Sequence, residues 1–199
     1  MKLKNIIIFF PNFSKGGIEK TSLLLSNFLE KKKILIKFIT FDKVDNNKFN
    51  FSKNIKFYHS KKKNNFFLLR NIYCVYILIQ NLFNHSKKDT IIFSLQNNIF
   101  SIIVSKVLGF KVVARNSAPI DYFLRKDIFL NKLKLFLKMK IYFYSDLIIS
   151  NSKSGANKIK NRLKNKKDII SIPNPIIKIE KKMNKVLKKN KILYVGRLS

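Results

Sequence analysis

The chain has 199 residues, of which 46% are hydrophobic and 26% are charged. This length allows one good-sized domain, or one domain and the start of another, and the apolar content excludes wholesale disorder. Cys74 is the single cysteine, so an internal disulfide is excluded. A lone cysteine fits a reducing cytoplasm and is most simply a small core residue.

The formal net charge of +32 at pH 7 would suit an anionic partner such as nucleic acid or a membrane surface. The composition offers a second explanation, because the chain is rich in Lys, Asn, Ile and Phe and only five of its 42 basic residues are Arg. This skew is typical of a proteome biased toward A- and T-rich codons. Proteins that read bases or phosphates usually favour Arg, so we attribute most of the charge to composition.

Two apolar stretches have features of membrane signals. The N-terminal run ends at Pro11 without a small-residue cleavage site, which argues against a signal peptide. The stretch 66–83 is the most apolar in the chain, but it contains Arg70, Asn71 and Gln80. A buried or half-buried helix therefore explains it better than a transmembrane span.

Apolar, β-branched runs alternate with helical patterns along the chain. Strands are predicted at 5–10, 34–41, 54–59, 90–95, 111–115, 146–150 and 168–172. Helices are predicted at 18–31, 66–84, 97–108, 127–144 and 152–164. This alternation predicts an α/β fold, a Rossmann-like parallel sheet with helices on both faces. Ligands of such sheets bind outside the carboxyl ends of the strands.

Gly16 and Gly17 follow the first predicted strand and open the first helix, in a chain with only five glycines. Without a Cβ they allow another group to approach the main chain, and the helix N-terminus offers unpaired N–H groups. The place suits a phosphate or a sugar hydroxyl, and a tight turn that needs glycine for geometry alone stays open. The phosphate-loop and G-x-G-x-x-G patterns are both absent.

Three further stretches are unusual. "VVARNSAP" (112–119) ends a strand with Arg115 and Asn116, and "SDLIISNSKSGANKI" (145–159) runs from a strand into a helix that Asn151 or Ser152 could cap. "IPNPI" (172–176) leaves the sheet through two prolines, which favour a stiff extended exit. A Lys-rich segment follows it, and "ILYVGRLS" then reads as a new strand that ends in a glycine turn.

Together these stretches resemble the amino-terminal half of a family 4 glycosyltransferase of the GT-B fold. The resemblance rests on "PNFSKGGIEKTSLLLSNFL", "ARNSAP", "SDLIISNSKSG" with "IPNP", and "ILYVGRLS", in that order. It implies an acceptor-side domain over 1–175, an interdomain linker over 176–190 and the start of a nucleotide-sugar-binding domain over 191–199. The expected activity is retaining transfer from a nucleotide sugar, in cell-surface polysaccharide or lipid-linked glycan synthesis, without a metal or other cofactor.

The resemblance also implies roles for single residues. Gly16 and Gly17 match a glycine loop that approaches the donor phosphate and sugar, and Arg115 and Asn116 match a segment that faces the cleft. Arg115 would orient an anionic acceptor group or neutralise the leaving diphosphate, and the alternative of a guanidinium that caps a strand end or packs on the next helix stays open. Gly196 and Arg197 match the donor-diphosphate site. Ser152 and Asn174 match common positions, for which we expect a structural role, and no catalytic residue is assigned.

Other parts of the family's donor site are not in the sequence. The lysine that usually follows the arginine and the E-x7-E motif that grips the donor would lie beyond Ser199. We therefore expect an amino-terminal fragment that does not transfer sugar alone. Two alternatives stay open: a basic nucleic-acid-binding protein, motivated by charge alone, and another sugar-nucleotide enzyme of the GT-B or Rossmann type.

Lysines at 31–33, at 61–63 and along the 127–144 helix could hold the protein on an anionic inner leaflet. The expected location is the cytoplasm, with peripheral attachment to the inner face of the plasma membrane as one interpretation of these lysines. The other interpretation is a core-facing helix at 127–144 with lysines on its rim. No specific nucleic-acid partner is expected.

Overall fold

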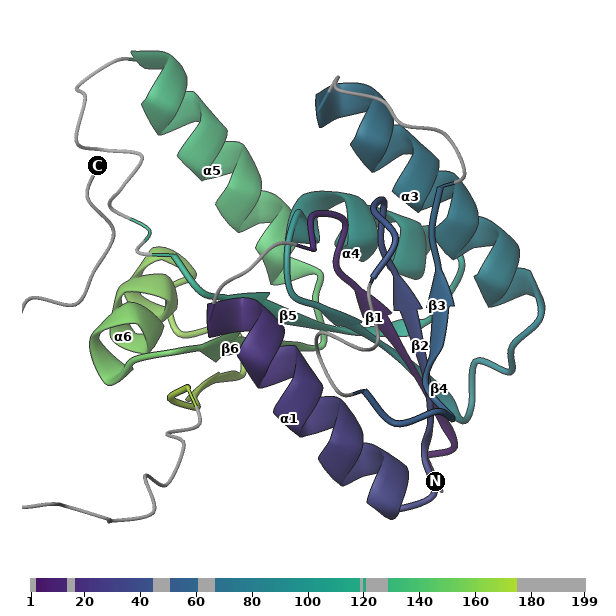
Figure 1. Cartoon of the computed structure of the whole chain (residues 1–199). Coiled ribbons are helices and arrows are strands. Elements are labelled where there is room, and N and C mark those ends of the chain that lie inside the picture. Colours follow the sequence, from purple (N-terminus) through teal and green to yellow (C-terminus); the bar gives the residue numbers. More distant parts are fainter. Residues whose placement is uncertain are drawn as a thin grey trace, which may run out of the picture.

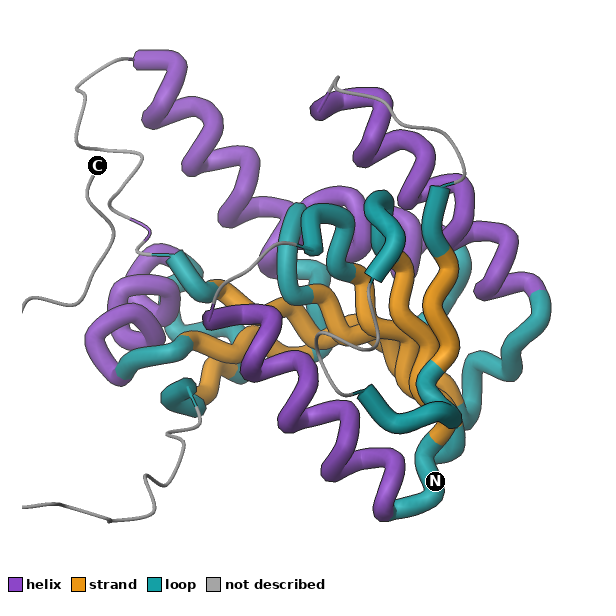
Figure 2. Tube along the Cα trace, in the orientation of Figure 1, coloured by secondary structure: helices purple, strands orange, loops and turns teal. Residues whose placement is uncertain are grey.

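Figure 1 shows the computed structural model, which describes residues 3–13, 17–44, 51–60, 67–118, 120 and 129–174. A seven-stranded sheet lies between helices on its two faces (Figure 2). The strand order is β3-β2-β1-β4-β5-β6-β7, and every neighbouring pair is parallel. The predicted α/β class and Rossmann-like parallel sheet are confirmed.

The elements follow the predicted order. The strands are β1 (Asn5–Phe9), β2 (Leu35–Ile39), β3 (Lys56–Tyr58), β4 (Thr90–Ser94), β5 (Lys111–Asn116), β6 (Leu147–Ser150) and β7 (Ile169–Ser171). The described helices are α1 (Gly17–Lys31), α3 (Phe67–Phe83), α4 (Asn98–Val107), α5 (Phe129–Phe143) and α6 (Lys153–Arg162). Every predicted boundary lies within two residues of the observed one, because strands buried on both faces read as continuous apolar runs.

Successive side chains of each strand point into two separate cores. One core holds alternate residues of the strands, such as Ile7 and Ile148, together with buried residues of α3, α4, α5 and α6. The other holds Ile8 and Phe38 and is covered by α1 and by the segment around Phe51. Four described helices therefore cover one face, and α1 is the only described helix on the other.

Helix α1 contacts the sheet mainly through small side chains. Its buried residues are Glu19, Ser22 and Ser26, and Ile18 and Leu29 pack partly against the same core, whereas Phe28 is exposed. Small serines let a helix lie close to the strands, and the Ser22 hydroxyl is satisfied by donating to the Glu19 carbonyl at 2.8 Å. The larger apolar side chains of α1 are thereby directed to the edges of this contact.

Helix α4 ends in a hydrogen-bond pattern that only a left-handed residue allows. Gly109 has φ +77°, its N–H donates to the Lys106 carbonyl, and the Phe110 N–H donates to the Ser105 carbonyl at 2.7 Å. This is a Schellman motif, in which the positive φ costs glycine little. It returns the chain directly into β5, with Phe110 buried in the core.

The helices can be compared with what the sequence predicts about a membrane span and about the apolar stretch 66–83. Within the described ranges, no helix is both long and apolar enough to cross a membrane. Residues 67–83 of the apolar stretch form α3, whose residues Cys74, Leu78 and Leu82 are buried in the core. Cys74 is a free thiol whose pKa burial raises to about 12, as expected for a core cysteine.

The contribution of α3 to the core can be measured with two leucines of the same helix. Leu78→Ala should lower the free energy of unfolding by about 2–5 kcal/mol, because Leu78 is fully buried and its removal leaves a cavity. Leu69→Ala removes the same atoms from a side chain that is 48% exposed, so its effect should stay below about 1 kcal/mol. Urea denaturation of both variants tests the placement, and equal losses would contradict it.

Candidate functional site at the carboxyl ends of the strands

Polar side chains gather where the central strands β4 and β5 end. A cavity of about 300 Å³ lies there, between the start of α1, the β4–α4 turn, the end of β5 and the inner face of α5. Its polar lining residues are Gln96, Asn97, Asn98, Arg115, Asn116, Ser117, Lys138 and Tyr142. None of the described lining residues is acidic, so its electrostatic character is positive.

Asn98 holds this region together. Its side-chain amide donates to the Arg115 carbonyl and to the Tyr142 hydroxyl, at 2.9 Å in each case, and its Oδ1 accepts from the Ser94 hydroxyl at 2.8 Å. One buried side chain thus connects β4, β5 and α5. Burial raises the pKa of the Tyr142 phenol while the Asn98 bond opposes this, so the phenol stays neutral at ordinary pH.

Arg115 is the most buried cation of the site, with 4% of its surface exposed. Its Nη2 donates to Oδ1 of Asn174, just after β7, while its buried Nη1 has no hydrogen-bond partner among the described residues. Burial lowers the guanidinium pKa below its usual value, but an arginine remains charged. An unpartnered N–H of a buried cation is the kind of group that an anionic ligand would satisfy.

Asn116 and Ser117 continue from Arg115 into the cavity. The Asn116 amide donates to the Ala118 carbonyl at 2.6 Å, and its Oδ1 accepts from the Lys138 ammonium at 3.3 Å. The Ser117 hydroxyl is buried without a hydrogen-bond partner among the described residues, although its carbonyl accepts from the Asn151 amide at 3.0 Å. The predicted pair Arg115 and Asn116 thus lies at one cavity, together with two hydrogen-bond donors, the Ser117 hydroxyl and the Lys138 ammonium.

Gly17 begins α1 at the same edge of the sheet, and the neighbouring Ile18 lines the cavity. A Cβ added to Gly17 would meet nothing within 4 Å, so its main chain lies beside open space. Gly16 lies outside the described residues. The candidate donor residues Gly196 and Arg197, and the predicted segments 176–190 and 191–199, also lie outside them.

The β6–α6 junction has a structural role. Ser152 caps α6, since its hydroxyl accepts from the Gly155 N–H at 3.1 Å. Gly155 is required by space, because an added Cβ would lie only 2.5 Å from the Ser150 hydroxyl oxygen. The serines and glycine of this motif therefore let α6 start close against β6. Asn174, in contrast, is part of the site through its bond to Arg115.

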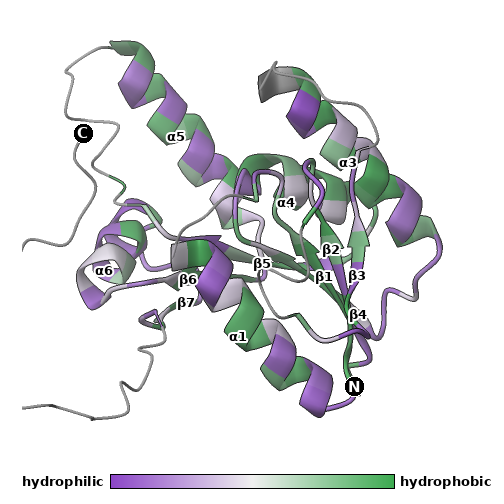
Figure 3. Cartoon of the chain, in the orientation of Figure 1, coloured by the Kyte–Doolittle hydropathy of each residue, from purple (hydrophilic) through white to green (hydrophobic). Residues whose placement is uncertain are grey.

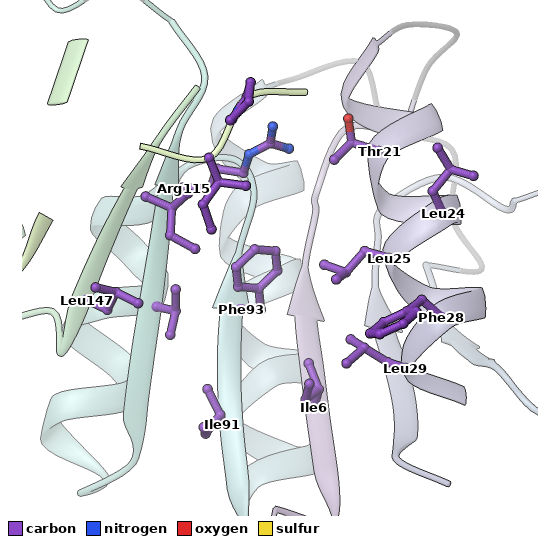
Figure 4. A pocket seen from close by; sticks show the side chains of 14 residues that line it. Ile6, Thr21, Leu24, Leu25, Phe28, Leu29, Ile91, Phe93, Arg115 and Leu147 are labelled. Carbon is purple, nitrogen blue, oxygen red and sulfur yellow. The ribbon is translucent and has the colours of Figure 1, made fainter. Parts of the chain in front are cut away.

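A second, apolar cavity of about 520 Å³ runs along the α1 face of the sheet (Figure 4). It is lined by residues of α1, β1, β4, β5 and β6, including Leu25, Phe93 and Leu147. Arg115 lies at its end, with the guanidinium beyond the apolar side chains. Arg115 therefore marks the boundary between an apolar groove and the polar cavity.

Several residues of the site were not identified from the sequence. Asn98 belongs to the polar run "QNN" (96–98) directly after the strand predicted at 90–95, so the rule for carboxyl ends could have found it. Tyr142 and Lys138 come from a distant segment and reach the cavity only in the fold. The sequence predicts a structural role for Asn174, and its contact with Arg115 also depends on the fold. No group of three or more His, Cys, Asp and Glu within the described ranges could hold a metal ion.

Comparison with known proteins identifies solved structures of similar fold. No family model and no curated protein matches the sequence. Among solved structures, the lipopolysaccharide outer core galactosyltransferase WaaB in its apo form aligns with TM-score 0.59 and 19% identity over 87% of this chain. Anabaena HepE in complex with UDP and glucose aligns with TM-score 0.58 and 10% identity over 86% of it.

A UDP-glucosyltransferase from Polygonum tinctorium aligns with TM-score 0.58 and 10% identity over 96% of this chain. At such identities the likeness concerns the fold, which is that of the Rossmann-like domains of GT-B glycosyltransferases. The alignments cover 46%, 44% and 56% of the three proteins. The chain thus spans about half the length of the structures it resembles.

The inward position of Lys138 predicts a pH-dependent stability. Burial lowers its pKa below 10.5, so between its folded pKa and 10.5 the unfolded chain binds more protons than the folded one. The contribution of Lys138 to stability should therefore rise with pH through that interval. Lys138→Met removes this contribution, and its stability relative to the parent chain should fall as the pH approaches 10.5. Urea denaturation at pH 7 and pH 10 measures both; an unchanged or larger relative stability at pH 10 would contradict the burial.

Proposed function

We propose that the chain is the acceptor-side domain of a family 4 glycosyltransferase, acting with retention on a nucleotide sugar in cell-surface polysaccharide or lipid-linked glycan synthesis. The observation that carries the proposal is the buried Arg115, whose Nη1 has no hydrogen-bond partner among the described residues and which lines a cavity of neutral and cationic polar groups at the carboxyl edge. The fold agrees with it, since WaaB is a galactosyltransferase and HepE was solved with UDP-glucose.

The chemistry assigned to these residues is electrostatic and positional. Arg115 would hold an anionic group, either on the acceptor or on the departing diphosphate, through its guanidinium, which Asn174 orients and whose Nη1 lacks a hydrogen-bond partner among the described residues. Asn116 and Ser117 would bind sugar hydroxyls, and Lys138 would add positive charge while held by Asn116. Such groups accelerate transfer by orienting the acceptor and stabilising negative charge, which requires no metal.

The binding of the donor diphosphate is assigned mostly to residues outside the described ranges. Gly196 and Arg197 would approach the donor diphosphate from a second domain, and Gly16 and Gly17 would approach it from this one. The open space beside Gly17 supports that part of the proposal. Cytoplasmic location follows from the same assignment, because nucleotide sugars are the donor substrates, and a buried free Cys74 agrees with a reducing compartment.

Loss of the Arg115 charge should weaken glycan binding. Arg115→Gln in the 199-residue chain should bind a panel of acidic and lipid-linked oligosaccharides at least about tenfold more weakly on a glycan array, because it loses a charge-assisted hydrogen bond. Arg115→Lys should lie between the two. Arg162→Gln, which removes an exposed arginine of α6, is the matched control and should bind normally. Thermal unfolding by circular dichroism confirms that each variant is folded, and equal binding by folded Arg115→Gln would refute the role.

The 199-residue chain alone should not transfer sugar, because the family's E-x7-E and lysine donor motifs are not in its sequence. Incubation with UDP-glucose or UDP-galactose and any glycan that the array identifies measures this. Turnover by this chain would contradict the assignment of donor binding to a second domain. Short RNAs titrated at several salt concentrations provide the contrast, since tight binding with base preference would favour the nucleic-acid alternative instead.

A further inference from the structure

Helix α5 exposes an apolar face to solvent. Phe129, Leu130, Leu133, Phe136 and Leu137 are 77%, 60%, 42%, 56% and 48% exposed. Only three residues of this helix, Leu135, Met139 and Tyr142, are fully buried, and they form the stripe that packs on the core. Neither interpretation of this helix from the sequence foresaw so narrow a contact, which leaves most of its apolar residues on the outside.

The exposed residues form one continuous face rather than scattered positions. At 100° per residue, Leu133 and Leu137 lie opposite the buried Leu135, and Phe136 and Leu130 lie on either side of them. An ordinary surface helix has polar residues on the side that faces the solvent. Contiguous exposed apolar area of this kind marks an interaction surface.

The charges around this face indicate what it contacts. Lys132 and Lys134 lie on opposite borders of the apolar arc, and Lys140 lies within it with its ammonium 4.9 Å from the centre of the Phe136 ring. Residues 129–143 contain no Asp or Glu. Apolar residues bordered by lysines, whose long stems can carry the ammonium outward, are typical of helices that lie in a membrane interface.

We propose that the outer face of α5 docks on an anionic lipid bilayer, lying parallel to its surface. The charge complementarity favours lipid over a protein partner, because an anionic headgroup layer above an apolar layer matches apolar residues with lysines at their border. A single helix with such a face binds reversibly, and the surplus positive charge of the chain adds long-range attraction.

The position of α5 gives this contact a consequence for the cavity. The inner face of α5 supplies Lys138 and Tyr142 to the polar cavity, while the beginning of the helix extends past the carboxyl edge of the sheet (Figure 1). Figure 3 shows apolar and polar residues alternating along the protruding helix. A bilayer held by the outer face would therefore contact the same helix that lines the cavity. The docking does not depend on what the cavity binds.

The absence of tryptophan from the chain allows a direct test. Phe136→Trp introduces the single indole at the centre of the proposed contact, and Phe83→Trp places it on α3 at a site that is 75% exposed. With vesicles of phosphatidylcholine and phosphatidylglycerol, Trp emission of Phe136→Trp should shift to shorter wavelength and be quenched by brominated acyl chains. Emission of Phe83→Trp should stay unchanged, and equal responses at the two sites would overturn the proposal.

A second pair of variants separates apolar docking from attraction by net charge. The triple change Leu133→Gln, Phe136→Gln and Leu137→Gln keeps every charge, and we expect about tenfold weaker binding to these vesicles in flotation. The matched control changes three exposed apolar residues outside α5: Leu35→Gln, Phe83→Gln and Val107→Gln. It should bind like the parent chain.

The remaining outcomes are equally decisive. Binding by the parent chain should weaken on vesicles of phosphatidylcholine alone and should persist in part at salt concentrations that screen exposed charges. Complete loss of binding in high salt, or equal binding by the α5 triple variant, would show attraction by charge alone and refute the docking. Concentration-dependent self-association that the triple variant abolishes, without any vesicle binding by the parent chain, would identify the face as a protein interface instead.

Discussion

The amide of Asn98 is the interaction on which the candidate site depends. It stands at the first turn of α4 and donates two hydrogen bonds, to the end of β5 and to α5, while it accepts one from β4. These elements are far apart in sequence, and each must satisfy buried polar groups where its regular structure stops. Because one side chain does this for three elements, the main chain at Arg115 is fixed by the core, while its guanidinium is held by Asn174 beyond β7.

The uneven covering of the sheet explains why Arg115 has two environments. Right-handed crossovers carry the connections after β3 to one face, where α3, α4, α5 and α6 bury their stripes. On the other face α1 covers β1 and β2, and the apolar residues of β4, β5 and β6 line the 520 Å³ groove. Arg115, at the end of the central β5, ends this groove and reaches the polar edge, so its guanidinium is desolvated without being enclosed by acidic partners.

The sequence predicted the fold more completely than the site, for physical reasons. Strands buried on both faces and helices with a 3.6-residue period are recognisable from local sequence patterns. Their order could therefore be inferred, and their ends could be placed to within two residues. Arg115 and Asn116 could be inferred because they end a predicted strand. Asn174 could not, because its contact with Arg115 spans 59 residues and follows from strand order.

Helices α1 and α5 show where periodicity alone fails. Both carry more apolar residues than one face can bury, so the pattern cannot say which of them meet the sheet. In α1 the serines make the contact and Phe28 is exposed; in α5 Lys138 turns inward to Asn116 while Phe136 turns outward. In each case the choice follows from how closely the helix approaches the sheet, which only tertiary packing determines.

A buried arginine with one satisfied and one open nitrogen is a costly arrangement for a purely structural residue. If Arg115 served only to hold Asn174, a neutral donor such as glutamine could make that bond without the desolvation that lowers the pKa of the guanidinium. A fixed positive charge gains its value when an anion enters beside it, since attraction at short range in a partly desolvated site exceeds that in water. The bond to Asn174 then has a second meaning: it fixes the planar guanidinium in advance, so that an anion reaching this edge would meet a charge that is already held in place.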